Sequence, residues 1–478
     1  MLSQFKKIIP KPLIKLYHYL LAIAANFFYD SPSDKLIVIG VTGTSGKSTV
    51  VYLITKLLES AGYKVGCAST ILFKVEKNEW LNDKKMTMVG RFALQKLIKR
   101  MVKANCQYAV IETTSQGIEQ YRHLGINYDI LVFTNLYPEH IQAHGSFANY
   151  KNAKLKLFAK LKNDSPKLFV GQKIKKTIIA NLDDEHASEF LDQWAEEKYG
   201  FGIAQKMIND KLQIMNPGEA EDPRWNRDKF SAEGGLASGE KTQNSKLKTI
   251  MADKIEIESD GASFQIDDTQ FNLKLLGQHN VYHALAAITV CLSQGLSLEV
   301  LAKNLQNISG IPGRLEFIKE SQPFKIIVDY AFEPKAVSAL YKVVKQIFHQ
   351  KIIHVLGSAG GGRDVSRRPA LGQLAGQNAD IVIVTNEDPY NEDPQKIIDQ
   401  VGQGAISAGK TVGQNLFKIL DRRQAIAKAL SLAQPNDLVL ITGKGSEQAI
   451  VGKNNKKIPW DDRIVAREEL GKILSIKP

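Results

Sequence analysis

A short apolar run that leads through a glycine-rich turn into a helix constrains this chain most. Residues 35–41 (Lys-Leu-Ile-Val-Ile-Gly-Val) are typical of a buried strand, because the run is short, apolar and β-branched. Residues 43–48 (Gly-Thr-Ser-Gly-Lys-Ser) follow, and residues 49–61 have a helical pattern that ends at Gly62. The order of strand, glycine turn and helix predicts an α/β fold with a phosphate-binding loop at the turn.

In a loop of this kind the backbone N–H groups and the start of the helix face the phosphates of a nucleotide. The ammonium of Lys47 would contact the β and γ phosphates, and the hydroxyl of Ser48 would ligate Mg²⁺. Val41 stands where the general spacing of such loops has a glycine, so the loop alone leaves a plain strand–helix turn open. The expected nucleotide contacts are Gly43, Thr44, Ser45, Gly46, Lys47, Ser48 and Thr49.

Further apolar runs extend the α/β pattern on both sides of a turn at Gly310-Ile-Pro-Gly313. Before the turn, strands are expected at 108–111 and 130–133, and each ends in polar residues, where parallel sheets bind ligands. After it, alternating strands and helices predict a second α/β unit, with strands expected at 325–328, 352–356, 381–384 and 438–441. We therefore expect a P-loop central domain with a parallel sheet and a C-terminal Rossmann-like domain, over residues 35–312 and 313–478.

Two segments depart from this pattern. Residues from about 205 to 260 include a polar, glycine-rich stretch, which predicts a surface insertion flanked by short antiparallel strands around Ile255 and over 264–271. Residues 1–34 are expected to form a short helical extension, with an apolar run at 13–28 that His18 and Asn26 interrupt. That run is too short to span a membrane, and it leaves open a helix packed on the protein, a peripheral helix on a membrane surface or a cleaved signal peptide.

The amino-acid composition limits the classes of binding partner to expect. The formal net charge of +13 suits a polyanionic partner, but the lysines are scattered rather than gathered in a basic arm with aromatic residues, which disfavours nucleic acid. The three cysteines are far apart in the sequence, as expected of a protein in a reducing cytoplasm. We expect a cytoplasmic, monomeric protein with small-molecule substrates.

Eight motifs follow one another along about residues 35 to 470. They are the loop at 40–49, Glu112-Thr-Thr-Ser-Gln-Gly117, Thr134-Asn-Leu-Tyr-Pro-Glu-His140, Tyr150-Lys-Asn-Ala-Lys154, Gly277-Gln-His-Asn280, Pro312-Gly-Arg314, Val328-Asp-Tyr-Ala331 and Gly443-Lys-Gly-Ser-Glu447. In this order they resemble the motifs of the Mur ligase superfamily. The branch with the closest resemblance is the MurE type, the UDP-N-acetylmuramoyl-tripeptide synthetases, because of Val-Asp-Tyr-Ala, the Gly-Gly-Gly-Arg-Asp run at 360–364 and Glu-Asp-Pro at 392–394.

The resemblance implies an ATP- and Mg²⁺-dependent ligase that activates a carboxylate as an acyl phosphate and joins it to an amino acid. Glu112 and His140 are then metal ligands together with Ser48, and Lys154 becomes a further ligand once carbon dioxide carbamylates it. Lys47, Glu112, His140 and Lys154 form the implied catalytic set. The implied contacts to adenine, phosphate and ribose are Asn280, Arg314 and Asp329.

The implied acceptor site departs from the diaminopimelate-adding enzymes. These carry Asp-Asn-Pro-Arg, whereas this chain has Glu-Asp-Pro-Tyr at 387–390, with two acidic residues and no arginine. The change favours lysine or another diamino acid over meso-diaminopimelate as the added amino acid. Gln116, Glu139, Phe332 and Ser446 are further departures. The implied substrate contacts are Ser115, Arg122, Glu387, Asp388, Gly443 and Glu447.

Only residues 1–34 precede the first expected strand, whereas similar enzymes begin with a domain that grips uridine diphosphate. We therefore expect the usual N-terminal domain to be missing, which leaves the carrier of the peptide open. Two rival functions also remain open. One is a related acid–amine ligase similar to the folylpolyglutamate or cyanophycin synthetases. The other is a pseudo-ligase that binds nucleotide without turnover.

Overall fold

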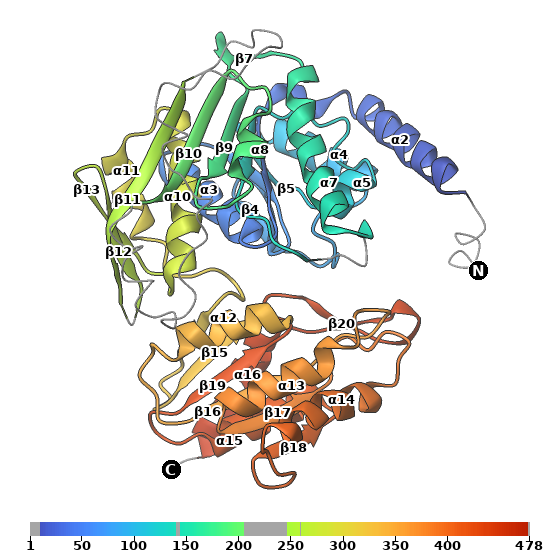
Figure 1. The fold of residues 1–478 in the computed structure, drawn as a ribbon, viewed down its shortest axis with the longest axis vertical. Helices are drawn as coiled ribbons and strands as arrows, with labels where there is room; N and C mark the ends of the chain where they lie inside the picture. Colours follow the sequence, from blue (N-terminus) through green and yellow to red (C-terminus); the bar gives the residue numbers. More distant parts are fainter. Residues whose placement is uncertain (1–9, 140–143, 205–245, 259, 477–478) are drawn as a thin grey trace, which may run out of the picture.

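The computed structural model describes residues 10–139, 144–204, 246–258 and 260–476. Two large β-sheets, each with helices on both faces, make up most of these residues (Figure 1). The first sheet uses strands between Ile37 and Leu273, and the second uses strands between Glu316 and Thr442. Both sheets are predominantly parallel, so the predicted α/β fold class is confirmed.

Eleven strands of the described residues form the first sheet. The strands from β11 to β2 run parallel, and antiparallel strands extend both ends of the sheet. In spatial order they are β13 (Thr269–Leu273), β12 (Ala262–Ile266), β11 (Leu247–Ile257), β10 (Glu197–Ile203), β9 (Thr177–Asn181), β6 (Ile130–Phe133), β1 (Ile37–Thr42), β5 (Tyr108–Glu112), β2 (Val65–Ala68), β3 (Leu72–Val75) and β4 (Asn78–Leu81).

Strand β1 lies inside this sheet and is buried on both faces, as its continuous apolar run predicts. Ile39 and Val41 pack into the core under α3 (Lys47–Ser60), α10 (Gln278–Ser293) and α11 (Leu298–Leu305). Val38 points to the opposite core. That core is covered by α4 (Arg91–Lys103), α7 (Phe147–Lys160) and α8 (Ala187–Leu191), and the short α5 (Ser115–Glu119) packs beside α7.

The second sheet has six described strands and the predicted alternation of strands and helices. Their spatial order is β14 (Glu316–Ile318), β15 (Lys325–Asp329), β19 (Leu438–Thr442), β16 (Ile352–Leu356), β17 (Ile381–Thr385) and β18 (Leu416–Ile419), of which β14 alone is antiparallel. One face packs on α12 (Pro334–Val344), α13 (Arg367–Asn378) and α14 (Pro394–Ser407), and the other on α15 (Arg422–Leu432) and α16 (Asp462–Ile476).

Small elements complete the described residues. Two hairpins lie outside the main sheets, β7 (Lys167–Phe169) with β8 (Gln172–Ile174) and β20 (Ala449–Val451) with β21 (Lys457–Pro459). Helix α2 (Lys11–Phe28) forms where the apolar N-terminal run predicts a helix, and it packs on α4. No helix within the described residues is long and apolar enough to cross a bilayer.

The stretch from about residue 205 to 260, expected as a surface insertion flanked by short antiparallel strands, differs in part from that expectation. Residues 247–257 form β11, which pairs in parallel with β10 and in antiparallel with β12. Ala252 and Ile255 of this strand are buried in the core, while several polar neighbours face outward. Residues 205–245 and 259, the rest of that stretch, lie outside the described residues.

Asp129 holds the amino end of β6 through a buried charge network. Its carboxylate accepts hydrogen bonds from Val38 N at 2.8 Å, Lys167 Nζ at 2.6 Å and Lys176 Nζ at 3.0 Å. Burial lowers the pKa of Lys167 to about 8, although Asp129 opposes that shift. The network lies at the edge of the sheet opposite the carboxyl ends of the strands, so it serves stability rather than ligand binding.

Replacing Asp129 with asparagine is expected to lower the free energy of unfolding by about 3–5 kcal/mol, because two buried ammonium groups lose their counter-ion. Urea unfolding followed by circular dichroism measures the loss. Asp268→Asn, at an exposed aspartate, is the matched control and should change the free energy by less than about 0.5 kcal/mol. Equal stability of the two variants would contradict this role of the network.

Candidate active site

The loop between β1 and α3 takes a shape that only glycine permits at two positions. Gly43 and Gly46 have φ angles of +154° and +78°. A Cβ on Gly43 would lie 1.9 Å from Oγ1 of Thr134, and one on Gly46 would lie 2.1 Å from Nε2 of His283. The backbone therefore comes close to its neighbours at both points, as expected of a loop that cradles phosphates.

The end of β6 fixes the loop in this shape. Asn135 accepts hydrogen bonds from Thr44 N (2.8 Å, main-chain oxygen) and Ser45 N (2.9 Å, Oδ1), and Thr134 Oγ1 donates to Ser45 O at 2.8 Å. Within the described residues, no side chain caps the first turn of α3, which leaves its N–H groups for an anion. Sequence analysis placed Thr134 and Asn135 in a motif but gave them no role.

Lys47 lies at the start of α3, and its Nζ donates a hydrogen bond to Thr44 O at 2.7 Å. Burial lowers the pKa of Lys47 from its usual value, and Glu112 opposes that shift. An incoming polyphosphate would add negative charge beside the ammonium and so favour its charged form.

Glu112 lies beside the loop because β5 pairs in parallel with β1, with Val41 opposite Glu112. The Glu112 side chain is 2% exposed, and its Oε2 accepts hydrogen bonds from Ser48 Oγ at 2.9 Å and Thr70 N at 2.7 Å. A carboxylate and a hydroxyl at a phosphate loop are the oxygen ligands that Mg²⁺ prefers, so this pair fits the ion. His140, the other predicted ligand from the sequence, lies outside the described residues.

Lys154 on α7 lies beneath the loop, not in the open cavity. Its side chain is 1% exposed, and its Nζ donates a hydrogen bond to Gly43 O at 2.7 Å. The same Nζ is 4.6 Å from the centre of the Tyr150 ring, whose hydroxyl donates to Thr44 Oγ1 at 3.1 Å. Burial first, and then the charge of Lys47, hold the pKa of Lys154 well below its usual value.

A cavity of about 2560 Å³ opens in front of the loop, between the first sheet and the elements that follow Gly310. Asn280 lines it from α10, where its Oδ1 contacts Nδ1 of His283 at 2.9 Å. Asp329 lines it from the end of β15 and accepts hydrogen bonds from Leu315 N and Ala331 N, each at 2.7 Å. Burial raises the pKa of Asp329.

Arg314 and two predicted substrate contacts also line the cavity. The guanidinium carbon of Arg314 is 4.2 Å from the centre of the Tyr330 ring. This cation–π contact holds the charged group at the wall of the cavity. Ser115 Oγ contacts Nε2 of His144 at 3.0 Å, and Arg122 donates to the Met88 carbonyl and, at 2.6 Å, to Gln120 Oε1.

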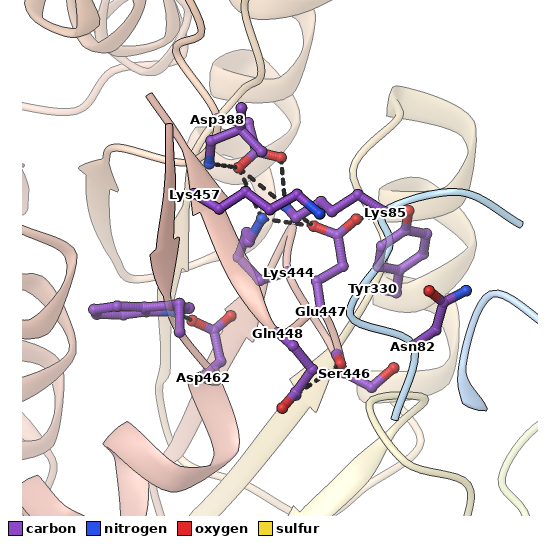
Figure 2. A network of polar contacts seen from close by, with 12 residues as sticks. Asn82, Lys85, Tyr330, Asp388, Lys444, Ser446, Glu447, Gln448, Lys457 and Asp462 are labelled. Atoms are coloured by element: carbon purple, nitrogen blue, oxygen red, sulfur yellow. Dashed lines mark hydrogen bonds and ion pairs between the residues drawn. The ribbon is translucent and has the colours of Figure 1, made fainter. Parts of the chain in front are cut away.

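A cluster of four charged groups lies where the acceptor site is expected (Figure 2). Lys85 Nζ is 2.8 Å from Asp388 Oδ2 and 2.7 Å from Glu447 Oε2. Lys444 Nζ is 2.9 Å from Asp388 Oδ1 and 2.6 Å from the same Glu447 oxygen. Lys85 comes from the turn after β4, whereas its partners follow β17 and β19, so the cluster joins the two parts of the chain.

Two further predicted acceptor residues lie next to this cluster. The side chain of Glu387 is 4% exposed, and burial raises its pKa. Its Oε2 is buried without a hydrogen-bond partner among the described residues. A Cβ on Gly443 would lie 2.6 Å from that oxygen, so glycine at this position makes room for the carboxyl group.

Comparison with known proteins agrees with this arrangement. Residues 41–217 match the model of the Mur ligase middle domain, and residues 313–445 match that of the Mur ligase, glutamate ligase domain. The UDP-N-acetylmuramyl-tripeptide synthetase of Roseiflexus sp. (strain RS-1) is 33% identical over 475 residues, which cover 97% of this chain and 85% of that relative. The chain belongs to the Mur ligase family.

Other comparisons agree with this assignment. The UDP-N-acetylmuramoyl-L-alanyl-D-glutamate--2,6-diaminopimelate ligase of Geobacillus thermodenitrificans (strain NG80-2) is 33% identical over 455 residues, 94% of this chain and 81% of that one. A solved structure of a ligase of the same name superposes with a TM-score of 0.56 at 26% identity, covering 92% of this chain and 79% of that one. A folylpolyglutamate synthase from Mycobacterium tuberculosis shares the fold, with a TM-score of 0.61 at 15% identity over 90% and 92% of the two chains.

As a member of this family, the chain is an ATP-dependent acid–amino-acid ligase.

The structure divides the predicted site residues of this Mur ligase that it describes into three groups. Those that line the cavity are Thr44, Ser45, Gly46, Lys47, Ser48, Thr49, Glu112, Ser115, Arg122, Asn280, Arg314 and Asp329. Gly43, within the loop, and Lys154, which donates to its carbonyl oxygen from behind the loop, do not line the cavity. Glu387, Asp388, Gly443 and Glu447 do not line the cavity, because Lys85 stands between it and the two carboxylates of the cluster.

Lys85 is the main residue that sequence analysis of this Mur ligase missed. It lies in a lysine-rich turn, and its partner Asp388 is 303 positions away in the chain, so no local pattern connects them. Its φ of +56° is unusual for a residue other than glycine and marks a turn held by its contacts. His283 is a second omission, although its spacing of three residues from Asn280 on one helix is a signal for contact.

Proposed function

We propose that this ligase adds a diamino acid, with lysine as the first candidate, to the carboxylate of a muramoyl peptide. The cluster of Asp388 and Glu447 around an ammonium group supports this most, because it already binds a lysine side chain. The reaction would form an acyl phosphate from ATP and release ADP and phosphate. The names of the Roseiflexus and Geobacillus relatives support a peptidoglycan precursor as the acid.

The first step joins two anions, since a carboxylate must attack the γ-phosphate of ATP. Lys47 and the N–H groups at the start of α3 would hold the phosphates and spread their charge. Mg²⁺, when bound at Ser48 and Glu112, would further neutralise that charge. Arg314, Asn280 and Asp329 face the same cavity and would hold the rest of the nucleotide.

Lys154 would act in its carbamylated form. A lowered pKa keeps more of the amine neutral at physiological pH, and only the neutral amine can attack carbon dioxide. The attack joins the amine nitrogen to the carbon of carbon dioxide, opens one of its C=O π bonds and releases one proton from the nitrogen, which changes the neutral amine into an anionic carbamate. As the family resemblance implies, the carbamate would hold the ion together with Ser48, Glu112 and His140.

The second step needs an amine beside the acyl phosphate. In the structure Asp388 and Glu447 share two ammonium groups, those of Lys85 and Lys444, so the four charges balance. Lys444 is 0% exposed and fixed, whereas Lys85 borders the cavity. The ammonium of an incoming diamino acid would take the place of Lys85 without changing the charge balance.

A panel of substrates tests the proposal. Phosphate release would be measured with UDP-muramoyl dipeptide and lysine, ornithine, meso-diaminopimelate or alanine, and with a folate acceptor and glutamate. We expect the highest kcat/KM with lysine or ornithine. Faster turnover with diaminopimelate would contradict the assigned amino acid, and turnover of the folate pair alone would favour the rival ligase. ATP binding without turnover on any pair would favour the pseudo-ligase.

We also propose a domain boundary at residues 312 and 313, with the P-loop domain before it and the Rossmann-like domain after it. The match to the Mur ligase, glutamate ligase domain supports this division, since it begins at residue 313. We further propose that the enzyme works as a cytoplasmic monomer.

A further inference from the structure

Helix α2 presents its more apolar face to solvent. Leu13, Leu16, Leu20, Ile23 and Phe27 are 55%, 51%, 55%, 47% and 85% exposed. Their spacing of three and four residues puts them on one face of the helix. Helices on globular proteins normally turn such a face to the core, so an exposed stripe of this kind marks a contact surface.

The opposite face of α2 attaches the helix to the protein. Ala22 and Ala25 are 1% and 0% exposed, and α2 packs there against α4. Figure 1 shows α2 at the margin of the molecule, on the side of α4 and α5 and away from the elements of the second sheet. The small alanines make the contact with the protein, and the large side chains remain outside it.

Cations border the apolar stripe where α2 ends. Phe28 is 71% exposed, and its ring centre is 6.1 Å from that of Phe92 on α4. Phe28 and Tyr29 line a shallow pocket together with Lys96, Lys99, Arg100 and Lys103, four basic residues of α4. The acid in this pocket, Asp30, is paired with Lys35 and Lys99, so the exposed side of α4 keeps an excess of positive charge.

We propose that the apolar stripe of α2 and the basic residues of α4 form a docking surface for an anionic lipid bilayer. Exposed leucines and aromatic residues next to lysines and an arginine are the composition of helices that lie in the interface of a membrane. Anionic headgroups would neutralise the cations of α4, whereas a second copy of the chain would bring two sets of cations together. Charge complementarity therefore selects the lipid surface over self-association.

Tyr19, on α2 but outside the docking surface, connects the helix to the segment beside the cavity. The ring of Tyr19 on α2 is 5.9 Å from that of Tyr121, in edge-on contact. The next residue, Arg122, lines the cavity. A bilayer bound at α2 would leave the elements of the second sheet away from its surface (Figure 1).

Sedimentation with lipid vesicles tests the proposal on the full chain. We expect binding to vesicles of phosphatidylcholine with phosphatidylglycerol to be at least about tenfold stronger than to phosphatidylcholine alone, and to weaken with salt. Leu16→Asp with Phe27→Asp should abolish binding to both. Leu168→Asp is the matched control, because Leu168 is a 74% exposed apolar residue on β7, outside the surface, and it should bind as the parent does.

Charge-reversed variants separate the two parts of the surface. Lys96→Glu with Lys103→Glu should remove the preference for anionic vesicles. Phosphate release with soluble substrates should stay unchanged in all variants, which shows that they fold. Unaltered vesicle binding of the Leu16→Asp, Phe27→Asp variant would overturn the proposal. If the parent is a dimer and the Leu16→Asp, Phe27→Asp variant is a monomer, the apolar face of α2 binds a second copy of the chain. If vesicle binding appears only after residues 1–9 are deleted, the apolar face is covered by residues 1–9.

Discussion

Replacing Lys154 with methionine is expected to lower turnover by about 10²–10³-fold, the loss that follows removal of one preorganised charged group at a reacting centre. Methionine fills similar space on α7, so the buried packing around Tyr150 should survive. Lys154→Arg should lose as much, because a guanidinium keeps the positive charge but cannot be carbamylated. The measurement is phosphate release at saturating ATP, with thermal unfolding as a check on folding.

Two observations decide whether the loss comes from the carbamate. The matched control is Lys151→Met, one turn away on α7. Lys151 is 23% exposed and pairs with Glu189, so this variant should keep nearly full turnover. Isotopically labelled bicarbonate should give a carbamate signal in the NMR spectrum of the parent and none in Lys154→Met. Undiminished turnover of Lys154→Met would end this assignment.

Asp388→Asn is expected to raise the KM for lysine by about thirtyfold, since losing one partner of a buried charge pair costs at least about 2 kcal/mol. Asparagine keeps the shape of the side chain and the oxygen that accepts from Val451 N at 2.8 Å. The KM for ATP should stay within about twofold, because Asp388 does not line the cavity in front of the phosphate loop. Steady-state kinetics in both substrates separates the two effects.

Lys85→Met, in the same cluster, is expected to act in the opposite direction. Removing this ammonium leaves Asp388 and Glu447 with Lys444 alone, so the site becomes negative and should bind a diamino acid more tightly. Lys84→Met is the matched control, because Lys84 is 57% exposed and pairs with its neighbour Asp83. A KM for lysine that rises in both Lys85→Met and Asp388→Asn would show that the cluster only holds the two parts of the chain together.

Much of the fold could be predicted because its determinants are local. The runs at 37–42, 108–112 and 130–133 are continuous and β-branched, and a strand buried on both faces needs just that pattern. Strand β11 was harder to predict, since its apolar residues are fewer and their spacing breaks at a bulge between Asp253 and Glu256. Its pairing with β10 depends on tertiary contacts rather than on its own sequence.

The sequence by itself determined the class of fold, the phosphate loop and the family, because each depends on short motifs whose residues are neighbours in the chain. The glycines at 43 and 46 are one example, since their φ angles exclude other residues. Only the tertiary structure decided that Lys154 lies behind the loop on Gly43 and that Lys85 fills the expected acceptor site. These contacts join residues far apart in sequence, and the burial that sets their charge states exists only once the two sheets and their helices have packed.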